Sequence, residues 1–117
     1  MRPRPVAKVV AAVSRLERPA LSVITVEEVL FGLALKPSVR MEDAFEILLS
    51  ACEILGVTEK VARRAAVMRG SLGARGRVRH QADMLIAATV AEHGATLVTR
   101  NVRDFDGCGI RVVDPFA

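Results

Sequence analysis

The sequence predicts an α/β fold with a mostly parallel sheet. Short runs rich in β-branched residues alternate with longer stretches whose apolar residues recur at helical spacing. Hairpin turns are almost absent between these runs, so helices must join successive strands, which is typical of a parallel sheet. A length of 117 residues with 51% hydrophobic residues suits one buried core. We therefore expect residues 1–117 to form a single domain.

Apolar periodicity and chain-breaking residues place the elements in order. Helices are predicted over residues 5–17, 25–35, 41–51, 59–72 and 81–93, and strands over residues 21–24, 54–57, 96–99 and 110–113. Pro5 suits the first turn of its helix, and Thr25 with Glu28 forms a capping box at the start of the second helix. Thr58 is the expected N-cap of the fourth helix, and Gly94 is the expected C-cap of the fifth.

Three carboxylates that are far apart in the sequence are predicted on one edge of the sheet. Glu28 lies in the first turn of the helix that follows the first strand, at the carboxyl end of that strand. Asp83 opens the last helix, which returns to the same edge because only a tight turn separates its far end from the next strand. Asp104 lies just beyond the end of that strand, with Thr99 and Asn101 between.

Clustered carboxylates favour a metal site. They repel one another unless a cation holds them, and hard oxygen ligands suit Mg²⁺, with Mn²⁺ as the alternative. Each acid alone also has a structural interpretation. Glu28 can complete the capping box, Asp83 can interact with the helix dipole, and Asp104 can cap a turn. The joint placement of the three acids is the observation that favours a metal.

A run of basic residues predicts a polyanionic partner. The net charge is +4, and seven cations without an intervening acid occur at Lys60, Arg63, Arg64, Arg69, Arg75, Arg77 and Arg79. A solvated helix face is the alternative explanation for part of this run. The chain has four Phe and neither Trp nor Tyr, so base stacking is a weak source of affinity and phosphate contacts are expected to dominate.

Other function classes are disfavoured. No apolar run is long enough to span a membrane, and the N-terminus lacks the apolar region of a secretory signal, so we expect a cytoplasmic protein. Cys52 and Cys108 have no metal-ligand spacing and are expected to be buried thiols. His93 suits a helix C-terminus, and His80 is expected in a loop, where substrate contact is the alternative role.

Three segments resemble PIN-domain proteins, most closely the VapC/FitB-like toxins of bacterial type II toxin-antitoxin pairs. They are LSVITVEEVLFG (Leu21 to Gly32), ADMLIAATVAEHGATLVTRNVRDF (Ala82 to Phe105) and the closing GCGIRVVDPF. The resemblance extends over essentially the whole chain from Arg2. It implies a three-layer PIN-like fold and an endoribonuclease that depends on Mg²⁺. A cognate antitoxin and a second copy of the chain are the protein partners that we expect.

The resemblance also implies roles for individual residues. Glu28 matches the second acid of the family pattern and Asp83 matches the third, and both are implied to be catalytic metal ligands. Asp104 matches the fourth region, with Asn101 as the other candidate, and Thr99 matches an accompanying hydroxyl residue. In this hypothesis the basic segment contacts RNA phosphates, and its candidate RNA-binding residues are Arg75, Arg77 and Arg79.

One part of the family pattern precedes these three segments. The family opens with a central strand that ends in a D-T-N or D-T-S signature, followed by a link that resembles the RPRP at Arg2–Pro5. This sequence starts at the link, so we expect an N-terminally truncated PIN-like domain. The helices that carry Glu28 and Asp83 are then not held at a fixed separation. Little nuclease activity is expected until that strand and its Asp are added.

Two other functions are compatible with the sequence. The first is a catalytically impaired PIN remnant that binds an antitoxin or RNA without cleaving it. The second, which does not use the resemblance, is a small regulatory α/β domain that binds a phosphate or a protein.

Overall fold

The structure is a computed structural model that describes residues 5–114, with side chains from residue 7. In chain order its elements are α1 (Pro5–Ser14), β1 (Pro19–Ser22), α2 (Val23–Leu35), α3 (Val39–Ala51), β2 (Glu53–Leu55), α4 (Glu59–Ala74), α5 (Gln81–His93), β3 (Thr96–Val98), the short 3-10 helix η1 (Val102–Phe105) and β4 (Arg111–Val113). Strands alternate with helices, so the predicted α/β fold class is confirmed.

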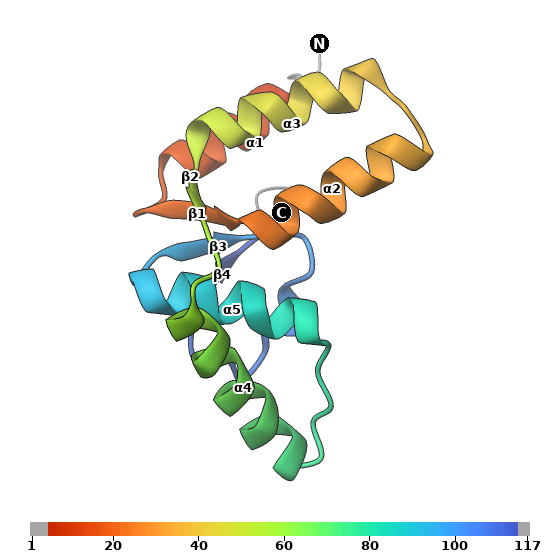
Figure 1. Ribbon diagram of the computed structural model, residues 1–117. Coiled ribbons are helices and arrows are strands. Elements are labelled where there is room, and N and C mark those ends of the chain that lie inside the picture. Colours follow the sequence, from red (N-terminus) through yellow and green to blue (C-terminus); the bar gives the residue numbers. More distant parts are fainter. Residues whose placement is uncertain (1–4, 115–117) are drawn as a thin grey trace.

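The sheet lies between two layers of helices. Its four strands have the order β2-β1-β3-β4, and every neighbouring pair is parallel. Figure 1 shows α1 and α3 on one side of the sheet and α5 with α4 on the other. This three-layer arrangement agrees with the expectation from the sequence.

Alternating residues of the strands fill the two faces of the sheet. Leu21 and Val98 pack with the helices α1 and α3, whereas Ala20 and Leu97 pack against α5. Because successive side chains of a strand point to opposite faces, each short strand contributes to both cores. Within residues 5–114 no helix is long and apolar enough to cross a membrane.

The start of α2 differs from the prediction. Ser22 ends β1 and is also the N-cap of α2, because its Oγ accepts a hydrogen bond from the backbone N–H of Ile24 at 3.1 Å. The helix therefore begins at Val23, so Thr25 lies inside it and the predicted capping box of Thr25 with Glu28 was wrong. Strand and helix share one residue, and no loop separates them.

Other boundaries shifted by a few residues. The helix α1 ends at Ser14 instead of residue 17, since the chain turns through Arg18, whose φ is +49°, into β1. The helix α4 runs to Ala74, beyond the end predicted at residue 72. The bounds predicted for α5 are confirmed, and Gly94 ends this helix in the left-handed conformation with φ of +60°.

The two inner strands pair directly. Pro19 and Ala20 of β1 lie opposite Thr96 and Leu97 of β3, so the sheet is continuous through the described residues. The helix α2 also contacts α5. The helices that carry Glu28 and Asp83 therefore have a fixed separation, contrary to the expectation. The strand β1 leads directly into α2, and it pairs with β3, which the turn at Gly94 joins to α5.

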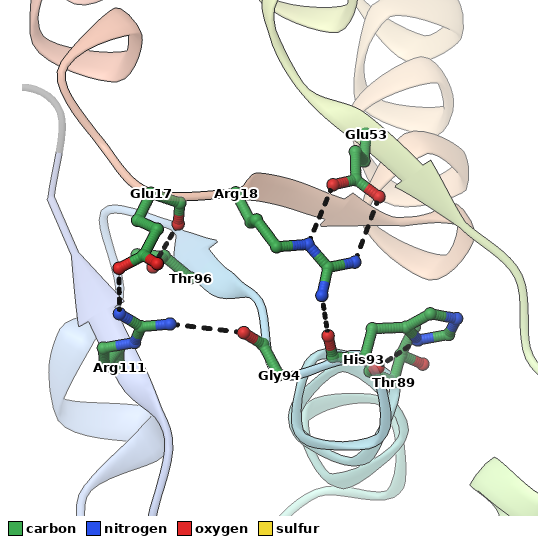
Figure 2. A network of polar contacts seen from close by, with 8 residues as sticks. All are labelled: Glu17, Arg18, Glu53, Thr89, His93, Gly94, Thr96 and Arg111. Carbon is green, nitrogen blue, oxygen red and sulfur yellow. Dashed lines mark hydrogen bonds and ion pairs between the residues drawn. The ribbon is translucent and has the colours of Figure 1, made fainter.

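A polar network holds the amino edge of the sheet (Figure 2). Arg18 donates a hydrogen bond to the carbonyl oxygen of His93 and forms an ion pair with Glu53 at 3.3 Å. Arg111 donates to the carbonyl oxygen of Gly94 at 3.2 Å and pairs with a Glu17 carboxylate oxygen at 3.2 Å. Two arginines thus satisfy carbonyl groups at the C-terminus of α5, where helix carbonyls lack partners within the helix. This network fixes the end of α5 opposite Asp83.

Candidate active site at the carboxyl edge of the sheet

The topology brings the three predicted acids to the carboxyl edge. Glu28 is carried there by α2, which follows β1 without a loop, and Asp104 belongs to η1, shortly after the end of β3. Asp83 lies in the first turn of α5. Because α2 begins at Val23, Glu28 lies in the second turn of this helix and not in the first, as the sequence had predicted.

Asp83 interacts electrostatically with both of the other acids. Burial raises the pKa of Asp83, and the negative charge of Asp104 raises it further, while His80 and Arg79 act in the opposite direction. Burial also raises the pKa of Glu28, followed by the charges of Asp83 and Glu27. Proximity of like charges disfavours the ionised forms. Asp83 is therefore the central acid of this edge.

The donor set suits a hard divalent cation by its chemistry, since it consists of carboxylate oxygens together with nearby hydroxyl and amide groups. In the side-chain positions described for residues 7–114, however, no three His, Cys, Asp or Glu residues converge closely enough to hold an ion. Asp83 is partly buried and fixed on α5, whereas Glu28 is exposed, so its long side chain has room to rotate. Asp83 therefore interacts electrostatically with Glu28 and with Asp104, although the three side chains do not converge.

The loop after β3 is ordered by its own hydrogen bonds. The backbone N–H of Asn101 donates to Oγ1 of Thr99 at 3.1 Å, and the N–H of Asp104 donates to the carbonyl oxygen of Asn101 at 3.1 Å. The N–H of Thr99 donates to the carbonyl oxygen of Val113 at 3.0 Å. Thr99 therefore shapes the turn that carries both Asn101 and Asp104. Of these two candidates, Asp104 is the one whose charge acts on Asp83.

Acids from outside the basic run compensate its first half. Glu92 of α5 pairs with Lys60 at 2.9 Å and with Arg64 at 2.8 Å, and these two cations lower the pKa of its carboxyl group. Arg63 pairs with Glu59 at 2.8 Å. These contacts join α4 to α5 or stabilise α4, so the first half of the run contributes to the fold. The sequence pattern missed this because Glu92 lies 28 residues from Arg64.

The second half of the run lies beside the acidic edge. Arg75 donates to Ser71 within α4, whereas Arg79 reaches another segment and donates from Nη2 to the carbonyl oxygen of Asp106 at 3.1 Å. The guanidinium of Arg77 packs on Gly107, since a Cβ at that position would lie 2.6 Å from Nη1. Arg77 and Arg79 therefore contact the loop that follows Asp104, and the charge of Arg79 also acts on Asp83.

The two histidines have different surroundings. His80 is the N-cap residue of α5, its side chain makes no capping hydrogen bond, and its charge lowers the pKa of Asp83. Nδ1 of His93 lies 2.9 Å from the carbonyl oxygen of Thr89 in the last turn of α5, as expected for a residue at a helix C-terminus.

An apolar groove between α2 and α3 was not predicted. Its walls include Leu30, Leu33 and Phe45, and acidic side chains such as Glu42 and Glu46 line it as well. The adjacent face of α2 is open, and Leu35 is 73% exposed. The signal in the sequence was the run VLFGLAL, which is apolar on every side although no residue of α2 is buried.

Comparison with known proteins places these features in a family. The family model described as "PIN domain" matches residues 2–107. Toxin FitB of Neisseria gonorrhoeae is 35% identical over 126 aligned residues, which cover 99% of this chain and 90% of FitB. VapC ribonuclease Y4jK of Sinorhizobium fredii is 31% identical, with coverage of 86% of this chain and 77% of that protein.

Solved structures agree with this assignment. The structure of FitAB bound to the IR36 DNA fragment matches with a TM-score of 0.75 and 32% identity, and it covers 99% of this chain and 87% of that chain. The FitAcB structure from Neisseria gonorrhoeae has a TM-score of 0.73 and 31% identity, over 98% and 89% of the two chains. This chain belongs to the PIN-domain family, with relatives among the VapC and FitB toxins.

Proposed function

We propose that this protein is a toxin-type endoribonuclease that cleaves RNA with the help of a divalent metal ion. The observation that carries the proposal is the electrostatic coupling of Asp83 to Glu28 and to Asp104 at the carboxyl edge of a PIN-domain sheet. Like charges at one edge disfavour the ionised forms of these acids, and a cation bound there would offset that repulsion.

Each residue has a distinct role in this proposal. Asp83, Glu28 and Asp104 would hold Mg²⁺, with Mn²⁺ as the alternative. When bound, such an ion supplies an activated water and neutralises charge on the phosphodiester. Thr99 and Asn101 support the site by holding the turn that ends in Asp104.

The cations beside the edge bind the RNA backbone. Arg75, Arg77 and Arg79 are the proposed contacts, because a guanidinium carries five N–H donors and each of these side chains uses only part of that set. Arg79 lies four residues before Asp83 and its charge acts on that residue, so a phosphate bound by Arg79 is close to the acidic edge. The RNA is thereby oriented for cleavage.

The nuclease hypothesis is tested with Asp83→Asn, which removes one negative charge and keeps the size of the side chain. We expect Mn²⁺ affinity, measured by calorimetry, to fall about 100-fold or more, and chelator-sensitive RNA cleavage to be lost. Glu59→Gln is the matched control, since Glu59 pairs only with Arg63 on the surface of α4. Equal metal affinity and equal cleavage in Asp83→Asn and the wild type would contradict the hypothesis.

We propose a cognate antitoxin and a second copy of the chain as protein partners, and the cytoplasm as the location. The groove between α2 and α3 supports an antitoxin, because its apolar walls and acidic side chains fit a peptide with apolar and basic residues. The neighbouring solved structures of relatives include the complexes FitAB and FitAcB. Antitoxin binding should weaken when Leu30, which lines the groove and is 46% exposed, is replaced by Ser.

The groove also favours a second candidate function, a catalytically impaired remnant that binds an antitoxin or RNA. The two hypotheses differ in one experiment. Antitoxin binding without chelator-sensitive cleavage of single-stranded or structured RNA by the wild type would favour the remnant, whereas cleavage that depends on Asp83 would favour the nuclease.

A further inference from the structure

The segment after η1 is held from two sides. Phe105 is buried against the core on the α5 side of the sheet, and Cys108 packs against the same core. Between them, Asp106 and Gly107 are exposed, and Gly107 has φ of +81°. Two arginines from the loop before α5 contact this exposed part: Nη2 of Arg79 donates to the Asp106 carbonyl oxygen at 3.1 Å, and Arg77 packs on Gly107.

We propose that Arg79 is a positioning residue that ties the loop after η1 to the start of α5 and thereby sets the spacing of Asp83 and Asp104. It lies four residues before Asp83, and its acceptor lies two residues after Asp104. This hydrogen bond thus adds a polar tie between the two segments that carry these acids, beside the packing of Phe105 and Cys108 on the core that includes Ile86. The inference deepens the proposed nuclease function and rests on it, because the spacing matters only if the two acids share a ligand.

The surroundings of Arg79 agree with a role in positioning. Its Nε is buried and has no hydrogen-bond partner among the described residues, so the side chain keeps this place despite an unsatisfied donor. It makes no direct ion pair with Asp83 in the described structure, although its charge acts on that residue. The hydrogen bond of Arg79 goes to the backbone of the neighbouring loop, where it fixes geometry and leaves the acids available.

Electrostatics and positioning predict opposite effects of Arg79→Ala. If Arg79 acted only through its charge, its removal would strengthen binding of a divalent cation, because one repelling charge is lost. If Arg79 sets the spacing of the acids, Mn²⁺ affinity measured by calorimetry should fall about 10- to 100-fold, as for other residues that orient metal ligands. Unchanged or stronger Mn²⁺ binding by Arg79→Ala would overturn the proposal.

Arg79→Lys separates the hydrogen bond from the buried nitrogen. Lysine keeps the positive charge, places a methylene where the unpartnered Nε lies, and presents Nζ for a hydrogen bond to the Asp106 carbonyl. We expect the Mn²⁺ affinity of Arg79→Lys to lie within about 3-fold of the wild-type value. This rescue is not expected if Arg79→Ala weakens Mn²⁺ binding only by lowering the stability of the fold. Arg63→Ala is the control, since among the described residues Arg63 pairs with Glu59 on the surface of α4, and its Mn²⁺ affinity should not change.

Amide hydrogen exchange tests the tie without a metal. The N–H groups of Asp104, Asp106 and Cys108 donate to carbonyl groups inside the η1 segment. In Arg79→Ala their exchange should accelerate about 10-fold or more, while the amides in the middle of α4 keep their rates. Unchanged exchange at these three amides would refute the role of Arg79 in holding the loop after η1. If the wild type binds no Mn²⁺, the proposed metal site is refuted, and the exchange rates alone then decide whether Arg79 holds the loop.

Discussion

Ser22 provides a direct test of where α2 begins, and so of where Glu28 stands. Its Oγ accepts from the N–H of Ile24, and the residue is fully buried at the end of β1. Ser22→Ala removes this N-cap and leaves a buried N–H without its acceptor. A lost cap costs about 1 kcal/mol, and the unsatisfied donor adds to that, so we expect about 1–2 kcal/mol of destabilisation.

The matched variant is Thr25→Ala. Thr25 is the third residue of α2, where alanine is the better helix former by about half a kcal/mol, so stability should stay equal or rise slightly. For a chain of 117 residues, 1 kcal/mol corresponds to about 4 °C in the unfolding midpoint. Thermal unfolding followed by circular dichroism should therefore show a decrease of about 4–8 °C for Ser22→Ala and no decrease for Thr25→Ala.

The opposite pattern would show that the reasoning is wrong. If Thr25 and Glu28 formed a capping box, Thr25→Ala and Glu28→Ala would each lower the midpoint by about the value of a lost cap, and Ser22→Ala would lower it less. In the structure, Glu28 instead experiences the repulsion of Asp83 and Glu27, so Glu28→Ala should leave the midpoint unchanged or raise it in metal-free buffer.

Three further predictions concern pH, backbone and RNA. The pKa values of Asp83 and Glu28 are raised from 3.8 and 4.5, so the folded chain binds these protons more tightly than the unfolded chain. In the presence of chelator, the two acids therefore contribute most to the free energy of unfolding below those ordinary values, and the contribution falls as pH rises through the raised values. Urea titrations at several pH values should show a flatter fall for Asp83→Asn than for the wild type. Arg18→Gly should cost less stability than Arg18→Ala, by about 1 kcal/mol in urea unfolding, because the φ of +49° strains any residue with a Cβ; equal losses would exclude that strain. RNA affinity should decrease steeply as the salt concentration rises. Replacing Arg75, Arg77 and Arg79 together with Ala should reduce the slope of log K against log salt concentration by about 2–3, and an unchanged slope would show that the RNA binds elsewhere.

Local signals in the sequence were sufficient for α5 and for the position of Asp83. The apolar residues of this helix recur on nearly every side, and Gly94 is a residue that adopts the left-handed conformation at a helix end without strain. The tight turn that follows fixes the direction of β3. The assignment of Asp83 to the carboxyl edge then follows from connectivity, which is a property of the sequence alone.

The start of α2 depended on tertiary structure. Thr25 with Glu28 fits a capping box by pattern, and the β-branched residues around Ser22 favoured a strand over residues 21–24, so the local pattern indicated the wrong cap. The pairing of Ser22 with Leu55 across the sheet and its full burial fix the end of β1, and the helix begins at the next residue. Strand register, a contact between distant segments, thus decided the position of Glu28.

The roles of the charged residues also depended on contacts between distant segments. A count along the chain from Lys60 to Arg79 shows no acid within the run, yet α5 brings Glu92 against Lys60 and Arg64. In the same way, the fold places the Asp106 carbonyl within reach of Arg79, which lies 27 residues away. The sequence by itself determined the fold class and the elements that carry the acids, because these depend on local periodicity, whereas charge partners depend on which surfaces the packing of helices brings together.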